Sequence, residues 1–333
     1  MHSSRTFVPR PPSSRARFAR VATRLTVRPL EHVIPDSPFG ISISRRVLAT
    51  LMATSSVTAR GVEVEQVDTR APENRIKGEW VRPETPRADG VILYIHGSGY
   101  NLCSTATHRP LVTRIAEQTG LAVFSTEYRL APDHVFPTAA NDVERAYDWL
   151  LEQGWSADQV VVAGDSAGGH LTLDLALVLL RSGRDLPAGL VMFSPLADVT
   201  FELCREREQI RRDPMMSAAG ARRLVAHYVA DTDPAHHRLT HVVEDGEVLP
   251  PTLIQAGGAE MLAADAHHIH RMLVATGTDS RLEVWPGQMH VFQAAPRAVP
   301  EADQALRRAT RFITDALKAR SAATAAQSQE VSA

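Results

Sequence analysis

The stretch VVVAGDSAGG at residues 160–169 carries most of the information about the fold. Its second half matches the pattern G-x-S-x-G, in the residues Gly164, Asp165, Ser166, Ala167 and Gly168. The pattern alone is weak because it arises by chance. Here a β-rich run precedes it and a long apolar helix follows it, and this strand–turn–helix setting exposes a serine hydroxyl above a sheet. We therefore predict that Ser166 is a nucleophile rather than a helix cap in a glycine-rich turn.

Strand-like and helix-like segments alternate on both sides of this stretch. Short apolar or β-branched runs predict strands at 91–95, 121–125, 160–163, 190–193, 252–255 and 281–285. Helical patterns lie at 110–119, 141–152, 171–180, 263–276 and 303–320. This alternation indicates the α/β class, with a mostly parallel sheet that helices cover on both faces.

The remaining segments suggest how the chain is divided. Residues 1–30 contain seven arginines and no acidic residue. Such a segment is either a basic arm that touches anionic lipid or a partner, or a poorly ordered terminus, and we favour the second. Residues 31–80 are expected to form a cap and the first strands, with a helix near 44–53 and strands near 62–67 and 78–81. A catalytic domain follows at 81–320. Within this domain, 199–247 is expected to be an insertion over the active site with one helical stretch at 218–228. After the domain, 321–333 is expected to be a disordered tail.

Composition narrows the class of protein. The chain has 333 residues and a formal net charge of −2, so its global charge does not suggest nucleic acid as a partner. Its two cysteines, Cys103 and Cys204, are expected to be reduced thiols in a cytoplasmic protein. The longest apolar run, 171–180, is too short to span a membrane, and the first thirty residues lack the apolar core of a signal peptide. A homodimer is left open.

A second glycine-rich loop follows the strand predicted at 91–95. It reads His96, Gly97, Ser98, Gly99. Backbone N–H groups of such a loop stabilise the oxyanion of a tetrahedral intermediate, and small residues let them approach it. A histidine in a glycine-rich turn would by itself be read as structural, but the G-x-S-x-G pattern about seventy residues later favours the functional reading.

These motifs resemble those of the bacterial (family IV) members of the hormone-sensitive lipase family. That family has an H-G-G-G loop and a G-D-S-A-G-G turn. Two further segments of this chain also resemble the family, YRLAP at 128–132 and LPPT at 249–252. The resemblance covers roughly residues 85–315 and implies an α/β-hydrolase fold. It also implies an oxyanion hole formed by the N–H groups of Ser98, Gly99 and Ala167. Ser98 replaces the middle glycine, so its hydroxyl is expected to narrow the acyl pocket.

The catalytic base is expected downstream, because the chain order of this fold is Ser, acid, His. His290 lies in WPGQMHVF at 285–292, a setting like the family's P-G-x-x-H-x-F. His267, His268 and His270 form another cluster, inside the helix predicted at 263–276. Two of them share a helix face and could bind a metal, but no carboxylate or cysteine set completes the site. We read the cluster as a polar helix face and predict no metal.

The acid that orients His290 is less clearly marked. The family places it after a strand in a G-x-x-D/E-x-L context, and GGAEML at 257–262 gives Glu260. Asp265 is the alternative. Glu260 is preferred because the end of a strand brings it to the same edge as Ser166 and His290.

The resemblance implies hydrolysis of short- to medium-chain, acetyl-type esters through an acyl-enzyme, with no cofactor. Some relatives remove N-acetyl groups in natural-product pathways, so an amide deacetylase is the main alternative. The same fold also serves as a non-catalytic receptor for small molecules when the histidine is lost. The presence of His290 argues against the receptor.

Overall fold

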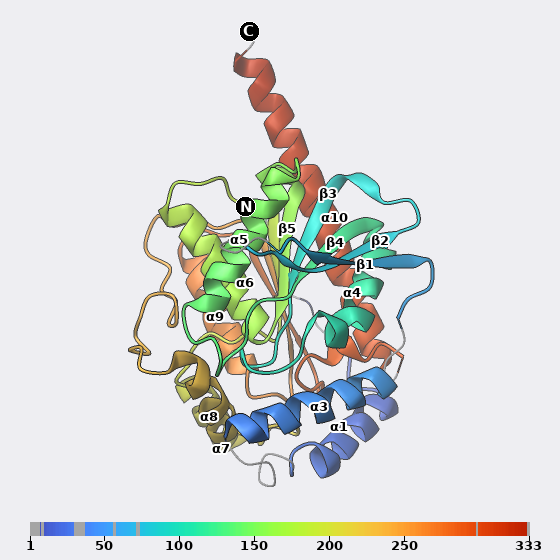
Figure 1. Ribbon diagram of the computed structural model, residues 1–333, viewed down its shortest axis with the longest axis vertical. Helices are drawn as coiled ribbons and strands as arrows, with labels where there is room; N and C mark the ends of the chain where they lie inside the picture. Colours follow the sequence, from blue (N-terminus) through green and yellow to red (C-terminus); the bar gives the residue numbers. More distant parts are fainter. Residues whose placement is uncertain are drawn as a thin grey trace.

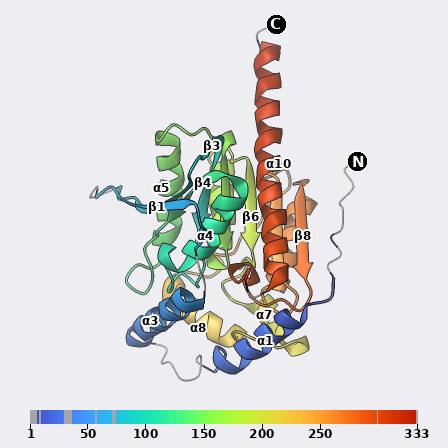
Figure 2. The ribbon, with the colours of Figure 1, turned by 90° about the vertical axis from the view of Figure 1, so that its right-hand side faces the viewer.

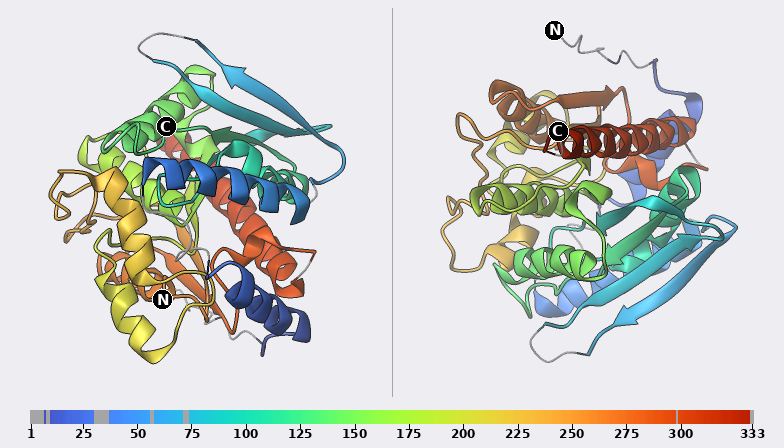
Figure 3. Two further views of the ribbon diagram at one scale, coloured as in Figure 1. Left: turned by 60° about the horizontal axis from the view of Figure 1, so that its bottom comes forward. Right: turned by 90° about the horizontal axis from the view of Figure 1, so that it is seen from above.

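The computed structural model describes residues 7, 10–29, 37–55, 58–70, 74–297 and 299–331. Within these ranges, eight strands form one sheet in the order β1-β2-β4-β3-β5-β6-β7-β8 (Figure 1). The strands are β1 Val62–Asp68, β2 Lys77–Pro83, β3 Arg87–Ile95, β4 Leu121–Thr126, β5 Val160–Asp165, β6 Gly189–Phe193, β7 Thr252–Gly257 and β8 Ser280–Trp285. The strands β4, β3, β5, β6, β7 and β8 are parallel to one another. At one edge of the sheet, β1 pairs with β2 and β2 pairs with β4, both in antiparallel fashion (Figure 3). The predicted α/β fold with a mostly parallel sheet is confirmed.

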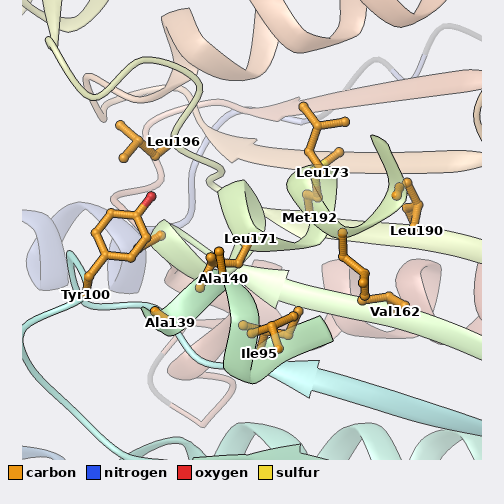
Figure 4. Packing of buried hydrophobic residues seen from close by; sticks show 14 of the residues in the cluster. Ile95, Tyr100, Ala139, Ala140, Val162, Leu171, Leu173, Leu190, Met192 and Leu196 are labelled. Carbon is orange, nitrogen blue, oxygen red and sulfur yellow. The ribbon is translucent and has the colours of Figure 1, made fainter. Parts of the chain in front are cut away.

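Helices cover both faces of the sheet. One face packs against α5 Thr138–Glu152, α6 Ala167–Arg181 and α9 Ala263–Ala275, and the other against α4 Thr105–Thr119 and α10 Pro300–Val331. Alternate residues of each strand point to opposite faces, so Leu93 and Ile95 belong to one apolar cluster and Ile92 to the other. Figure 4 shows the first cluster, where Ile95, Val162 and Met192 from three strands meet Leu171 of α6. This packing fixes the turn that carries Ser166.

Four helices form a cap at one end of the molecule. They are α1 Ser14–Thr26, α3 Pro38–Ser55, α7 Glu202–Ile210 and α8 Ala218–Val229 (Figure 2). The arrows of β6 and β8 in Figure 2 point towards this end, so the cap lies at the carboxyl ends of the parallel strands. Ligands of open α/β sheets bind at that edge.

Residues 14–26, expected to be part of a poorly ordered arm, form helix α1 instead. Ser13 caps the helix by accepting a hydrogen bond from the N–H of Ala16, and its own N–H and hydroxyl donate to the carboxylate of Glu301. Phe7 lies 4.7 Å from the ring of Trp285. Contacts with residues almost three hundred positions away therefore fix this segment, and they leave no local pattern in its sequence.

The structure adds detail to three other expected segments. The boundary at residue 80 falls inside β2, which pairs with β4, so the sheet begins at β1. The insertion at 199–247 contains α7 as well as the expected helix, now α8. The tail expected to be disordered from residue 321 continues α10 to Val331, because the alanines and glutamines of this stretch are good helix formers.

Candidate active site

Ser166 occupies the tight turn between β5 and α6. Its backbone has φ +54° and ψ −120°, a conformation that L-residues rarely adopt and that is common where strain serves function. The N–H of Ser166 donates to the carbonyl of Phe193 at 2.9 Å, and its carbonyl accepts from the N–H of Leu196 at 3.1 Å. These two bonds to the segment after β6 hold the strained turn. The side chain is half-buried.

The glycine-rich loop after β3 lies directly against this turn. A Cβ atom added to Gly97 would lie 2.9 Å from the Cβ of Ser166, and one added to Gly168 would lie 2.0 Å from the carbonyl oxygen of Ile95. Neither position can accept a side chain without displacing the backbone. The two motifs found in the sequence are therefore in contact, and glycine is required where they meet.

Ser98 and Gly99 follow in this loop with positive φ angles of +112° and +62°. Among the hydrogen bonds of the described residues, none uses the N–H of Ser98 or of Gly99. The Ser98 hydroxyl donates to the carbonyl of Leu102. The hydroxyl thus has a hydrogen-bond partner within the loop, and its effect on the acyl pocket stays a prediction.

The buried side chain of Asp165, next to Ser166, connects the turn at Ser166 to the glycine-rich loop after β3. Its carboxylate accepts from Tyr94 Oη at 2.7 Å and from the N–H of Gly97 at 3.1 Å, and it lies 3.2 Å from His108 Nε2. Burial would raise the pKa of Asp165, but the charge and hydrogen bond of His108 outweigh it and hold that pKa below its ordinary value. The ring of His96 stacks on Tyr128 at 4.3 Å, and burial lowers the pKa of His96. Asp165 and His96 therefore stabilise the glycine-rich loop after β3 through buried contacts.

Glu260 and His290 meet at the ends of β7 and β8. Nδ1 of His290 lies 2.6 Å from Oε2 of Glu260, and both side chains are buried. The other carboxylate oxygen accepts from the Ser194 hydroxyl at 2.8 Å and from the N–H of Gly257 at 2.6 Å. Burial would lower the pKa of His290, but the hydrogen bond and charge of Glu260 outweigh it, so the pKa of His290 is raised. Such a pair holds one imidazole tautomer and favours its protonated form.

Asp265, the alternative acid, has other partners. It accepts from the N–H groups of Ala197 at 2.9 Å and Asp198 at 3.3 Å, and from the Cys204 thiol at 3.0 Å. None of its hydrogen bonds within the described part of the chain reaches His290. Burial raises the pKa of Asp265 to about 7. The carboxyl of Asp265 thus bonds to the segment after β6 and to α7.

Comparisons with known proteins identify the family of the chain. The profile of the α/β hydrolase fold family matches residues 92–294. An acetyl-hydrolase of Streptomyces hygroscopicus is 37% identical over 239 residues, 72% of this chain and 79% of the relative. The carboxylesterase/phospholipase LipF of Mycobacterium tuberculosis is 33% identical over 323 residues, 92% of this chain and 83% of the relative. The crystal structure of an esterase from the bacterial hormone-sensitive lipase family superposes with a TM-score of 0.82 at 29% identity, covering 92% of this chain and 99% of that one.

The chain belongs to the hormone-sensitive lipase family of α/β hydrolases. The resemblance found in the sequence motifs and the α/β-hydrolase fold are confirmed. As a member of the hormone-sensitive lipase family the protein is an enzyme of the carboxylesterase class. Across the described ranges, no helix has the combination of length and apolar composition that a membrane crossing requires.

Several residues that support this hormone-sensitive lipase site were not predicted. Ser194 and Asp213 are examples: Asp213 is buried, its carboxylate accepts from the N–H of Met261 at 2.7 Å, and its carbonyl accepts from Arg28 of the N-terminal segment. Arg207 of α7 donates to the carbonyl of Glu260 at 2.7 Å. The cap is therefore attached to the loop that carries Glu260.

The other histidine cluster lies on α9, as expected. His270 Nδ1 is 2.9 Å from the Ser280 hydroxyl, and burial lowers the pKa values of His267, His268 and His270. In the part of the chain that the structure describes, no group of three or more His, Cys, Asp or Glu side chains is arranged to hold a metal ion.

Proposed function

We propose that this esterase hydrolyses short- to medium-chain, acetyl-type esters through a Ser166–His290–Glu260 triad and an acyl-enzyme. The observation that carries the proposal is the 2.6 Å contact between His290 Nδ1 and Glu260 Oε2. It leaves Nε2 as the imidazole nitrogen available to a nucleophile. Ser166, at the carboxyl end of β5, provides the hydroxyl that the strained turn presents.

In this mechanism His290 removes the hydroxyl proton as Ser166 Oγ attacks the acyl carbon of the ester. The carbonyl oxygen becomes an oxyanion, which the N–H groups of Ser98, Gly99 and Ala167 stabilise. The tetrahedral intermediate collapses, and His290 returns the proton to the leaving alcohol. Water, activated by the same histidine, then hydrolyses the acyl-enzyme.

The electrostatics of the pair support this assignment. Charge develops on the imidazole as it takes the proton, and the carboxylate of Glu260 stabilises that cation. The same interaction with Glu260 stabilises protonated His290 in the free enzyme, where it appears as a raised pKa of His290. The carboxylate is held in turn by the Ser194 hydroxyl and the N–H of Gly257, which restrict its rotation.

The substrate class is proposed from the relatives. One is named acetyl-hydrolase, another carboxylesterase/phospholipase, and a solved structure is titled as an esterase. Two of these names specify ester hydrolysis and one specifies an acetyl group, and an acetyl-type ester combines the two. An N-acetyl amide would pass through the same acyl-enzyme, so paired O-acetyl and N-acetyl substrates separate ester from amide hydrolysis.

The test combines activity with covalent labelling. We expect hydrolysis of p-nitrophenyl acetate and butyrate to fall by about 10⁴-fold or more in Ser166→Ala. A p-nitrophenyl phosphonate should add one phosphonyl group, which peptide mass spectrometry would locate on Ser166. The control is Ser182→Ala, because Ser182 is exposed at the end of α6 and its hydroxyl donates to a carbonyl within that helix. Retained turnover in Ser166→Ala, or a label on another residue, would refute the proposal.

A further inference from the structure

The cap exposes large apolar side chains. Among the exposed large hydrophobic residues of the described chain, the five most exposed on the cap are Phe18 at 75%, Val21 at 52% and Leu25 at 71% of α1, Phe39 at 72% of α3, and Ile210 at 89% of α7. We call these five residues the cap face. Among the described residues outside the cap, the exposed large hydrophobic residues are valines, none more than 56% exposed. Large apolar side chains exposed at one end of a protein are typical of an interaction surface.

Folding does not explain the apolar side of α1. Successive residues of a helix are about 100° apart, so Phe18, Val21 and Leu25 lie on one side and the buried Ala16 on the opposite side. The helix is attached to the protein through that opposite side and through the bonds of Ser13 to Glu301. The apolar stripe therefore points away from the body, where polar residues would serve stability equally well.

Positive charge accompanies the cap face. Arg15, Arg17 and Arg24 of α1 are exposed, and the segment has no acidic residue before Glu31. The four cap helices carry ten arginines and three glutamates, whereas the whole chain has a formal net charge of −2. The charge of this protein is thus strongly asymmetric, with the cap as its cationic end.

We propose that the cap face docks on an anionic lipid surface. Aromatic and aliphatic side chains flanked by arginines are the pattern of helices that lie in the headgroup region, where apolar burial and attraction to anionic lipids act together. A second copy of the chain fits less well, because two cap faces in contact would bring their arginines together. Docking would turn the carboxyl ends of the strands, where Ser166 and His290 lie, towards the lipid (Figure 2).

Vesicle sedimentation with the full chain tests the proposal. Vesicles of phosphatidylcholine with phosphatidylglycerol should bind the protein at least about tenfold more strongly than phosphatidylcholine alone. Salt on the order of 1 M, where the Debye length is about 3 Å, should remove that difference. Equal binding to both vesicle types, or no binding to either, would overturn the proposal.

Two double variants separate the contributions. Phe18→Ser with Leu25→Ser removes apolar contact, and Arg17→Gln with Arg24→Gln removes charge; each should weaken vesicle binding by roughly tenfold or more. The matched control is Val274→Ser, an exposed valine on α9 outside the cap, which should bind as the unmodified protein does. Hydrolysis of p-nitrophenyl acetate without vesicles verifies that each variant is folded.

The same variants distinguish lipid from a second copy. Sedimentation velocity should give the same oligomeric state for the unmodified protein and for the double variant Phe18→Ser with Leu25→Ser. Dissociation of an oligomer in this variant would assign the cap face to self-association and overturn the proposal. This inference is independent of the triad, because vesicle binding is measured without substrate.

Discussion

The Ser194 hydroxyl donates a hydrogen bond of 2.8 Å to Oε1 of Glu260, the carboxylate whose other oxygen contacts His290. The same hydroxyl accepts from the N–H of Val291 at 3.1 Å, so one serine joins the loop after β6 to both the acid and the residue that follows the histidine. Ser194 is therefore a positioning residue for the proposed triad.

Replacing Ser194 with alanine should lower kcat about tenfold and leave KM nearly unchanged. A hydrogen bond to a charged group contributes roughly 1.5–3 kcal/mol, part of which is expressed as correct orientation of the imidazole. Steady-state kinetics with p-nitrophenyl acetate would measure this, with Ser182→Ala as the control. An unchanged kcat would show that the N–H of Gly257 is sufficient to orient the carboxylate of Glu260.

Glu260→Gln and Asp265→Asn should have very different effects on turnover. Glutamine keeps the size of Glu260 but cannot stabilise the imidazolium, so kcat should fall by roughly 10²- to 10⁴-fold. Asparagine keeps the size of Asp265, whose hydrogen bonds within the described residues do not reach His290 and whose pKa is raised to about 7, so loss of this charge should leave activity at neutral pH largely intact. Comparable losses in both variants would contradict the choice of Glu260.

The pH dependence of kcat/KM should follow His290. The base is active only when neutral, so activity is lost as the pH falls through its pKa, which lies above the ordinary value of about 6.5. In Glu260→Gln the interaction that raises this pKa is absent, and the acid limb should move to lower pH. Rates measured from about pH 5 to pH 9 would show the shift. A limb that stays in place would mean that another group titrates.

Ser98→Ala and Ser98→Gly should separate strain from hydrogen bonding in the oxyanion loop. Both lose the bond to the Leu102 carbonyl, but only glycine relieves the φ of +112°. We expect the glycine variant to be more stable than the alanine variant by about 1–2 kcal/mol in the free energy of unfolding. Denaturant unfolding measures the difference. Because the proposed donor is a backbone N–H, both should keep kcat within about tenfold; a larger loss in both would give the hydroxyl itself a role.

The sequence was sufficient for the parts of the fold that local patterns determine. Strand–helix alternation predicted the parallel sheet, and G-x-S-x-G with its flanking strand and helix predicted the turn at Ser166. The same holds for the loop at Gly97, because close backbone approach requires glycine at fixed positions. The roles of Ser166, Glu260 and His290 stay predictions until the variants above are measured.

Other features depend on contacts between distant residues. Nothing in the local sequence distinguishes Ser194 from other serines, because its role depends on the pairing of β6 with β7. The role of Asp213 likewise depends on the hydrogen bond that it accepts from the N–H of Met261. Helix α1 was missed because arginine-rich sequence with nearby prolines is also typical of poorly ordered termini. Its docking depends on Glu301 and Trp285, which no local pattern connects to it.

Helix α10 extends beyond the body of the molecule at the end opposite the cap (Figure 1). This arrangement separates the point of attachment from the working end. An affinity tag, a fluorophore or a link to a solid support at the end of α10 would hold the enzyme with its cap turned outward. The protein could thus be immobilised in one orientation, with its cationic end free to meet vesicles or ester substrates in the surrounding solution.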